Sequence, residues 1–212
     1  MKNYNVIVLN LKHREDRRNR ILNLFNNYFD QYFKIFILEA YLNKKNGHKG
    51  CAFSHSLAIE YAIHKKMNNL IIVEDDVYFP YPLDKLKATL LELEKIEWDL
   101  IALGSNFDIE KDISENLTKP SRMWQATMQI INKNYFQKYY EFLFKSFKNQ
   151  EEYFKPGENL SWNDPWVFDQ VWNKELLGKD KIYCTKNRFA YQIANMSNTT
   201  NVMMDGVKEF IQ

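Results

Sequence analysis

Three adjacent carboxylates, Glu74, Asp75 and Asp76, directly follow the apolar run 70–73. That run is typical of a buried strand, so the acids stand where a strand leaves the core. Because side chains alternate along a strand, we expect Glu74 and Asp76 on one side and Asp75 on the other. Two carboxylates on one side suit a hard divalent cation such as Mg²⁺ or Mn²⁺, which takes oxygen ligands and leaves room for substrate phosphates. The alternative interpretation is that the acids only solvate the exit of the strand.

A basic segment follows the first predicted strand, "YNVIVLNL". Asn10, Arg14 and Arg17 are expected to face the same crevice as the acids, where guanidinium groups would meet phosphate oxygens. The alternative is a solvated helix start, in which Glu15 and Asp16 pair with the arginines along the helix face.

A third candidate segment is "GHKGCAFSHS". Gly47 and Gly50 allow tight backbone geometry, and a helix that begins close to Ser54 would offer free N–H groups to an anion or a sugar hydroxyl. His55 is placed to hydrogen-bond a ligand, although a histidine beside apolar residues also serves as a satisfied structural group.

The elements that position these residues alternate between strand and helix over the first half of the chain. A helix capped by Asp16 is expected after the first strand, and the pattern of 83–96 predicts an amphipathic helix. The polar segment 105–122 is weakly patterned and is predicted to be a loop. Alternating elements predict an α/β fold with a Rossmann-type, mainly parallel central sheet flanked by helices. In such sheets ligands bind at the carboxyl ends of the strands, where the acids lie.

The composition fits one globular domain spanning residues 1–212. Hydrophobic residues make up 45% and aromatic residues 16% of the chain, which is ample for a core. A net charge of +2 argues against a nucleic-acid-binding protein. Two cysteines, Cys51 and Cys184, do not form a disulfide framework. With no apolar run long enough to span a membrane and no signal peptide at the start, we expect a soluble, cytoplasmic protein.

Three blocks, "VLNLKHREDRRNRI", "GHKGCAFSHSLAIEYAI" and "LIIVEDDVYF", resemble in order and spacing glycosyltransferase family 25, and "WDLIALG" extends the likeness. This family comprises the lipopolysaccharide-biosynthesis and procollagen galactosyltransferases. The resemblance implies a GT-A fold, a nucleotide-sugar donor that is commonly UDP-linked, a divalent metal (Mn²⁺ or Mg²⁺) on a DxD-like motif, and an inverting reaction. The acceptor would be a hydroxyl of a glycan or of a hydroxylated protein.

Carried onto this chain, the DxD-like role falls on the acidic triplet. Asp76 would bind the metal and the diphosphate, and Glu74 would be the second metal ligand. Glu74 or Asp75 would hydrogen-bond the ribose or the water ligands of the metal. The remaining residues that the resemblance assigns to donor binding are Asn10, Leu11, Arg14, Arg17, Ser54 and His55.

Inverting transfer also needs a base that deprotonates the acceptor hydroxyl. The segment "NDPWVFDQVW" is similar to a later acidic block of the family near the acceptor, and we expect Asp169, or second Asp164, to be the catalytic base. Nearby indole faces for a sugar ring would come from Trp162, Trp166 and Trp172. The alternatives are a helix-surface acid and ordinary core packing of the tryptophans. Where the family carries a further acid near its end, this chain has Asn198.

Other functional classes fit the sequence less well. A phosphoacceptor receiver domain would carry its acids near the N-terminus of a chain about half as long. A nucleotidyltransferase would open with a glycine-rich loop after the first strand, and "NLKHREDRR" has no glycine. A non-catalytic carbohydrate-binding protein descended from an enzyme is the alternative that the sequence leaves open.

Overall fold

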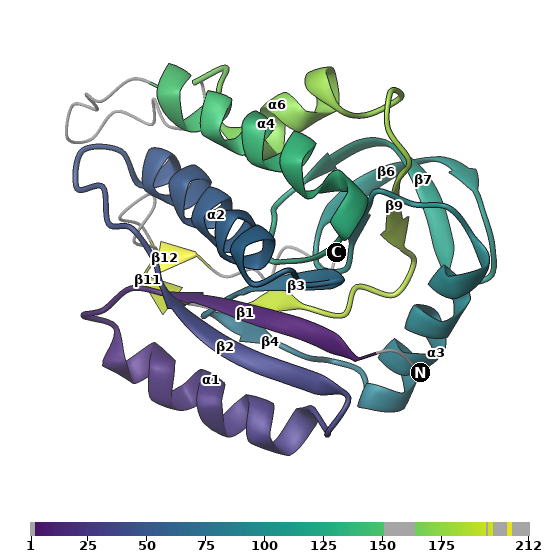
Figure 1. Cartoon of the computed structure of the whole chain (residues 1–212), viewed down its shortest axis with the longest axis horizontal. Coiled ribbons are helices and arrows are strands. Elements are labelled where there is room, and N and C mark those ends of the chain that lie inside the picture. Colours follow the sequence, from purple (N-terminus) through teal and green to yellow (C-terminus); the bar gives the residue numbers. More distant parts are fainter. Residues whose placement is uncertain (1–2, 151–163, 194, 197–202, 205–212) are drawn as a thin grey trace.

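The computed structural model describes residues 3–150, 164–193, 195–196 and 203–204. Its centre is an eight-stranded sheet with the strand order β2-β1-β3-β8-β5-β9-β7-β6. The fold is α/β with helices on both faces of the sheet (Figure 1). Among the described residues, no helix is both long and apolar enough to cross a lipid bilayer.

The first half of the chain builds the parallel part of the sheet. Strand β1 (Tyr4–Asn10) lies between β2 (Phe33–Glu39) and β3 (Asn69–Glu74), and it pairs with both in parallel. Helices α1 (Glu15–Tyr28) and α2 (Gly47–His64) make the two crossovers. Since β1 and β3 run in the same direction, their carboxyl ends meet at one edge of the sheet.

The second half adds antiparallel pairs. Strand β8 (Met128–Asn132) runs antiparallel to both β3 and β5 (Leu100–Ala102), and β9 (Ile182–Thr185) pairs with β5 in parallel. The expected loop over 105–122 is wrong. This segment forms a hairpin of β6 (Asn106–Asp112) and β7 (Leu117–Trp124) at the sheet edge. Strand β6 is mostly exposed, so charged residues occupy both of its faces and hide the strand periodicity.

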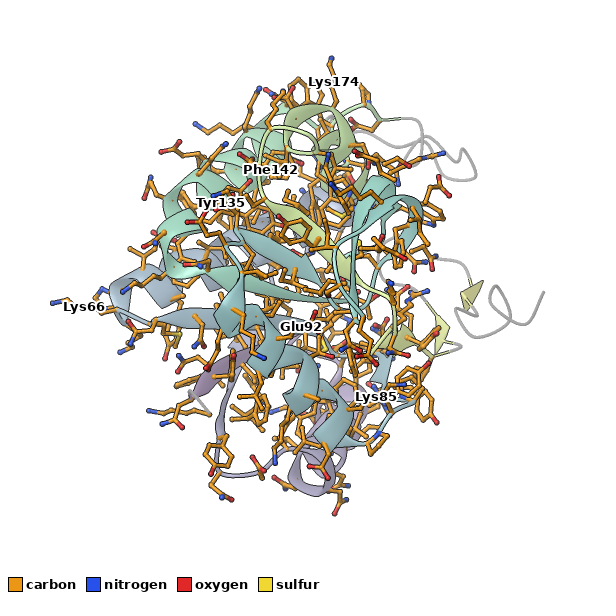
Figure 2. The ribbon with its side chains drawn as sticks, turned by 90° about the vertical axis from the view of Figure 1, so that its right-hand side faces the viewer. Lys66, Lys85, Glu92, Tyr135, Phe142 and Lys174 are labelled. Atoms are coloured by element: carbon orange, nitrogen blue, oxygen red, sulfur yellow. The ribbon has the colours of Figure 1, made fainter. Side chains whose placement is uncertain are left out.

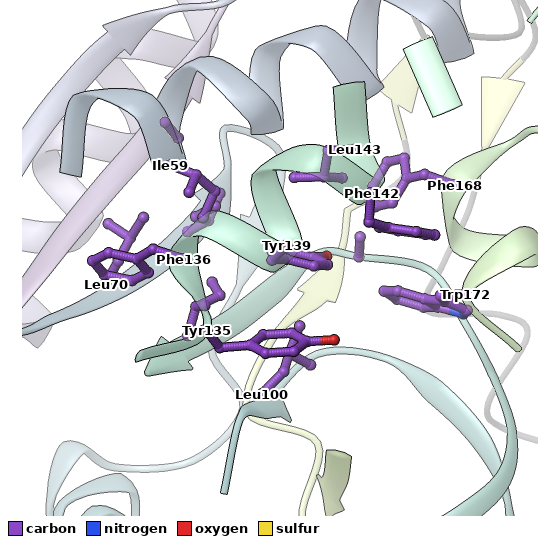
Figure 3. Packing of buried hydrophobic residues seen from close by; sticks show 14 of the residues in the cluster. Ile59, Leu70, Leu100, Tyr135, Phe136, Tyr139, Phe142, Leu143, Phe168 and Trp172 are labelled. Carbon is purple, nitrogen blue, oxygen red and sulfur yellow. The ribbon is translucent and has the colours of Figure 1, made fainter. Parts of the chain in front are cut away.

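Two hydrophobic cores cover the two faces of the sheet. Helix α1 and helix α3 (Leu83–Glu92) bury their apolar sides against one face. Helix α2 covers the other face together with α4 (Phe136–Asn149) and α6 (Phe168–Glu175). Figure 3 shows this second core, where the rings of Tyr139, Phe142 and Trp172 lie close together. The predicted amphipathic helix over 83–96 is confirmed as α3 followed by the short 3-10 turn η1 (Leu93–Lys95).

Short elements complete the chain. Strand β4 (Val77–Tyr78) pairs antiparallel with β10 (Tyr191–Gln192), and β11 (Asn195–Met196) pairs with β12 (Met203–Met204). The 3-10 turn η2 (Lys133–Tyr135) leads into α4. The side chains of Lys66 and Lys174 extend away from the molecule (Figure 2), whereas Tyr135 and Phe142 are buried. The pairing of β4 with β10 brings Tyr191 and Gln192 beside the acidic residues that follow β3.

Two helix starts differ from expectation. Helix α2 begins at Gly47 with Asn46 as its cap, whose side chain accepts a hydrogen bond from the Lys49 N–H, so Ser54 lies two turns inside the helix. Helix α1 begins at Glu15, and Asp16 sits in its first turn without capping it. The side chain of Asp16 is instead held by the Arg14 guanidinium.

Gly50 lies where α2 closely approaches the segment that follows β2. A Cβ atom at this position would stand 2.9 Å from the Tyr41 carbonyl oxygen and 3.0 Å from the Asn43 nitrogen. We expect Gly50→Ala to lower the free energy of unfolding by about 1–3 kcal/mol, because backbone atoms must move to admit the methyl group. Urea denaturation measures this loss. Gly178→Ala is the comparison, because its methyl group would meet no neighbour and would only add backbone strain at a positive φ. An unchanged urea midpoint for Gly50→Ala would contradict the close approach.

Candidate active site

A pocket lies at the carboxyl ends of β1 and β3, between α1 and α2. Its walls include the start of α2, the segment after β2 and Gln192 of β10. Six of the residues expected to bind donor or metal line this pocket: Leu11, Arg17, Ser54, Glu74, Asp75 and Asp76. The sequence therefore locates the pocket correctly, because the carboxyl ends of neighbouring parallel strands converge there.

The acidic triplet does not continue the strand. Strand β3 ends at Glu74, and Asp75 and Asp76 form a turn before β4. The expected pairing of Glu74 with Asp76 on one side is wrong, since the alternation of a strand stops where the chain turns. Instead Asp75 and Asp76 face α1 together, and Glu74 faces α2.

Arg17 joins the two aspartates. Its Nη1 donates to Asp75 Oδ1 at 2.8 Å and to Asp76 Oδ2 at 3.1 Å, and its side chain is only 7% exposed. Asn10, at the end of β1, donates its Nδ2 to the other Asp75 oxygen at 2.6 Å. Arg20 donates to the carbonyl oxygens of Asp75 and Val77 and so holds the turn. Part of the repulsion among the acids is thus relieved by cations of α1.

Asp76 nevertheless retains an uncompensated oxygen. Its Oδ1 is buried without a hydrogen-bond partner among the described residues. Burial, and then the charge of Glu74, raise the pKa of Asp76 to about 7, although Arg17 acts in the opposite direction. The pKa of Glu74 is lowered: burial opposes this shift, but the His55 imidazole and the Gln192 amide outweigh it. An added positive charge at the pocket would therefore be favourable.

Arg17 makes a testable contribution to stability. We expect Arg17→Gln to lower the free energy of unfolding by about 1.5–3 kcal/mol, because hydrogen bonds to two buried carboxylates are lost. Chemical denaturation measures it, and Arg18→Gln on the exposed side of α1 is the matched control. Added Mg²⁺ should restore part of the loss by supplying another cation to the same acids. Equal stability of the two variants would contradict this role.

The other residues expected near the donor lie around the pocket or outside it. Arg14 pairs with Asp16 at 2.8 Å and does not line the pocket. Ser54 Oγ donates to the Gly50 carbonyl oxygen and accepts from the Tyr41 N–H, so it ties α2 to the segment after β2. His55 is fully buried, with its Nε2 3.7 Å from Glu74 Oε1.

The two candidate bases behave differently. Asp169 lies in the first turn of α6, where its Oδ2 accepts a hydrogen bond from the Gln125 N–H at 3.0 Å. Burial first, and then the charge of Glu74, raise the pKa of Asp169 to about 6. Asp164 makes a local turn instead, accepting from the Trp166 N–H at 2.8 Å, and it precedes α6, which begins at Phe168.

The tryptophans of this segment are mainly structural. Trp172 is fully buried and donates its indole N–H to the Met123 carbonyl oxygen, so its expected role as a sugar platform is wrong. Trp166 is half-buried with the Lys145 ammonium over its ring. Trp162 and Asn198 lie outside the described residues.

Two pocket residues that contact Glu74 escaped the sequence reasoning. Gln192 donates its Nε2 to Glu74 Oε2 at 2.9 Å, and no pattern in the sequence links these positions 118 residues apart. Cys51 lines the pocket with its Sγ 3.7 Å from Glu74 Oε1. Its spacing of four from His55 on a helix places both on one face and was a usable signal.

Solved structures with a similar fold include glycosyltransferases. A glycosyltransferase involved in glycosylation of the major capsid of PBCV-1 matches with a TM-score of 0.54 and 12% identity, over 86% of this chain and 80% of that one. GlyE of Streptococcus pneumoniae TIGR4 matches with a TM-score of 0.48 and 12% identity, over 88% and 46% of the two chains. A mutant Drosophila β-1,4-galactosyltransferase 7, in complex with manganese, UDP-Gal and xylobiose, matches with a TM-score of 0.41 and 10% identity, over 98% and 78%. The last two TM-scores are below 0.5, and it is the first similarity that supports the GT-A fold.

No curated protein sequence matches the chain. Residues 31–203, however, match the family described as glycosyltransferase family 25 (LPS biosynthesis protein). This match covers most of the chain, including α2, β3 and the acidic residues of the pocket. It agrees with the fold and includes the second and third sequence blocks quoted above, whereas the first block, residues 8–21, precedes it. The protein therefore belongs to glycosyltransferase family 25 and is a glycosyltransferase.

Proposed function

We propose that this glycosyltransferase moves a hexose from a UDP-linked donor, with inversion, to a hydroxyl of a glycan or a hydroxylated protein, and that it uses Mn²⁺ or Mg²⁺. One observation carries the proposal: three carboxylates, an arginine and the first turn of a helix meet in one pocket at the carboxyl ends of parallel strands. Carboxylate oxygens bind a divalent cation, and that cation can bind the oxygens of a diphosphate. The UDP group and the inverting outcome rest on the family resemblance.

The residues of the pocket fit a hard divalent cation. Asp76 Oδ1 is buried without a partner among the described residues, and further carboxylate oxygens of Glu74 and Asp75 line the same space. Oxygen ligands of this kind are those that Mg²⁺ and Mn²⁺ prefer. We assign the cation to the space between Asp76, on the α1 side of the pocket, and Glu74, on its α2 side, while Asp75 is engaged by Asn10 and Arg17. When bound, the cation would neutralise charge on the departing diphosphate.

The pocket is small for a whole donor. Its volume of about 120 Å³ is below that of pockets that enclose a drug-sized ligand. We therefore assign the diphosphate end of the donor to it, with Leu11 beside the nucleotide. Gly47, at the N-terminus of α2, presents the positive end of the helix dipole to the same space.

The acceptor side is assigned to Asp169. A general base works best when its pKa lies near the working pH, and burial brings the pKa of this carboxyl to about 6. Its Oδ2 is oriented by the Gln125 N–H, and we assign the proton of the acceptor hydroxyl to Oδ1, which is buried without a partner among the described residues; Asp169 itself is not one of the residues that line the pocket. Asp164, whose Oδ1 accepts from the Trp166 N–H in a local turn before α6, is the second choice.

A sugar-binding protein without turnover is the second candidate. It is favoured by the Arg17 side chain, which already supplies a positive charge to Asp75 and Asp76. A panel of UDP-, GDP- and CMP-hexoses separates the two functions, with donor hydrolysis measured with and without Mn²⁺. The proposal expects Mn²⁺-stimulated hydrolysis of a UDP-sugar. Thermal stabilisation by a donor without hydrolysis would favour the second candidate.

A further inference from the structure

Cys51, His55 and Glu74 form a cluster on the α2 side of the pocket, opposite the pair of aspartates. Cys51 and His55 are one helical turn apart, so both side chains lie on the face of α2 that meets the end of β3. Glu74 Oε1 is 3.7 Å from Cys51 Sγ and 3.7 Å from His55 Nε2. One potential ligand atom from each residue lies within 4.8 Å of the other two.

These separations are close to those of ligands around one tetrahedral ion. With zinc–sulfur, zinc–nitrogen and zinc–oxygen bonds of ordinary length, a tetrahedral site puts sulfur about 3.5 Å and imidazole nitrogen about 3.3 Å from a carboxylate oxygen. The two observed distances of 3.7 Å exceed these values by a few tenths of an ångström. They are too long for a strong hydrogen bond from the imidazole to the carboxylate. The imidazole–carboxylate spacing therefore fits two ligands of one ion better than direct contact, and the Cys51 thiol, which donates a long hydrogen bond to the same Glu74 oxygen, lies at a distance that an ion would also give.

His55 gives an independent indication. Its side chain is completely buried, and neither Nδ1 nor Nε2 has a hydrogen-bond partner among the described residues. A buried polar group without a partner costs about 1–3 kcal/mol, so such groups usually have a ligand or a water. The Phe168 ring packs against the imidazole at 5.0 Å between centroids, which limits its rotation. Nε2 is thus held towards Glu74.

We propose that Cys51, His55 and Glu74 bind a borderline transition-metal ion of the Zn²⁺ class. A thiolate and an imidazole favour Zn²⁺ or Co²⁺, whereas Mg²⁺ and Mn²⁺ favour oxygen ligands alone. Cys51 and Glu74 line the pocket, so the ion has an entry path and a free coordination position faces the pocket. Gln192 holds the second oxygen of Glu74 and orients this carboxylate.

The site is distinct from the one that the proposed function assigns to the donor's cation, although Glu74 belongs to both. Replacing Glu74 would therefore disturb both sites and decide nothing. Cys51→Ser and His55→Gln are the informative variants, because neither residue is assigned to Mn²⁺ or Mg²⁺ binding. Cys184→Ser and His64→Gln are the matched controls: Cys184 is a buried free thiol outside the pocket, and His64 is exposed at the end of the same helix.

Titration of the metal-free full chain with Co²⁺ tests the proposal. Cobalt bound to the thiolate gives a sulfur-to-metal charge-transfer band in the near ultraviolet, which cobalt on carboxylates alone lacks. We expect this band in the wild type and in both controls, and its loss in Cys51→Ser. Zn²⁺ should displace Co²⁺, and His55→Gln should weaken Zn²⁺ binding at least about tenfold, since even residues that only support a metal ligand cost 10–100-fold.

Two results would overturn the site: wild-type protein that binds Co²⁺ without a sulfur band, or wild-type protein that binds no Co²⁺ at all. Because both use unaltered protein, misfolding of the His55 variant cannot obscure them. Donor hydrolysis with Mn²⁺ is followed in parallel. Hydrolysis without a sulfur band would reject the Cys51 site and leave the proposed function standing, whereas a sulfur band without hydrolysis would do the reverse.

Discussion

Replacing Asp76 with Asn is expected to reduce Mn²⁺-stimulated donor turnover by at least about 100-fold while the fold persists. The substitution removes one negative charge from the pocket and with it the carboxylate assigned to the cation. Interactions that stabilise charge developed in a transition state are worth several kcal/mol in a buried site. Because burial already disfavours the charged form of Asp76, its loss should not lower the free energy of unfolding.

The measurement is the initial rate of UDP-sugar hydrolysis over a Mn²⁺ titration, together with thermal unfolding of the same samples. Asp84→Asn is the control, since the Asp84 side chain is 94% exposed on α3. The Asp76→Asn variant should show little residual rate at saturating donor and should need a higher Mn²⁺ concentration for that rate. Wild-type turnover with an unchanged Mn²⁺ dependence would remove Asp76 from the metal site and leave it with its ion pair to Arg17.

Asp169→Asn should spare donor binding and reduce transfer to the acceptor by about 10²–10⁴-fold, the usual contribution of a positioned base. Asn retains an oxygen that can accept from the Gln125 N–H, so the start of α6 should keep its structure. Measured kcat should fall with little change in the donor KM. In the wild type, transfer should decline as the pH drops below about 6, where Asp169 takes up a proton.

The raised pKa of Asp169 also predicts how the free energy of unfolding changes with pH. The folded-state pKa of about 6 exceeds the ordinary value of 3.8, so the folded protein binds this proton more tightly than the unfolded chain does. The free energy of unfolding therefore falls as the pH rises from 3.8 to about 6. Above that range the full destabilisation caused by ionising the buried Asp169 is present. Asp169→Asn removes the cost and should stabilise the fold at neutral pH by at most about 3 kcal/mol.

Asp164→Asn serves as the comparison for both measurements. Its Oδ1 accepts from the Trp166 N–H in a local turn, so it should affect stability more than transfer. If Asp169→Asn transferred sugar at the normal rate while Asp164→Asn did not, the base would be reassigned to Asp164. If both variants were fully active, the base would lie outside this segment.

The amino-acid sequence by itself determined the parallel half of the fold and the position of the pocket. The strands β1 and β3 have apolar centres, residues 6–9 and 70–73, and the amphipathic pattern of α3 is strong, so local physics identifies each of them. The polar groups that directly follow β1 and β3 then have to meet at one sheet edge. This reasoning placed Leu11, Arg17 and the acidic triplet around a common pocket.

Only the tertiary structure decided how the pocket residues pair and what the second half of the chain does. The turn after Glu74 sends Asp75 and Asp76 to Arg17 and sends Glu74 to α2, which depends on helix positions that no local pattern encodes. In the hairpin of β6 and β7, the strand periodicity of the exposed β6 is masked by charged residues. The contact of Gln192 with Glu74 spans 118 residues. In each case long-range packing chose the partner, because side-chain type and spacing specify only what lies within a few residues.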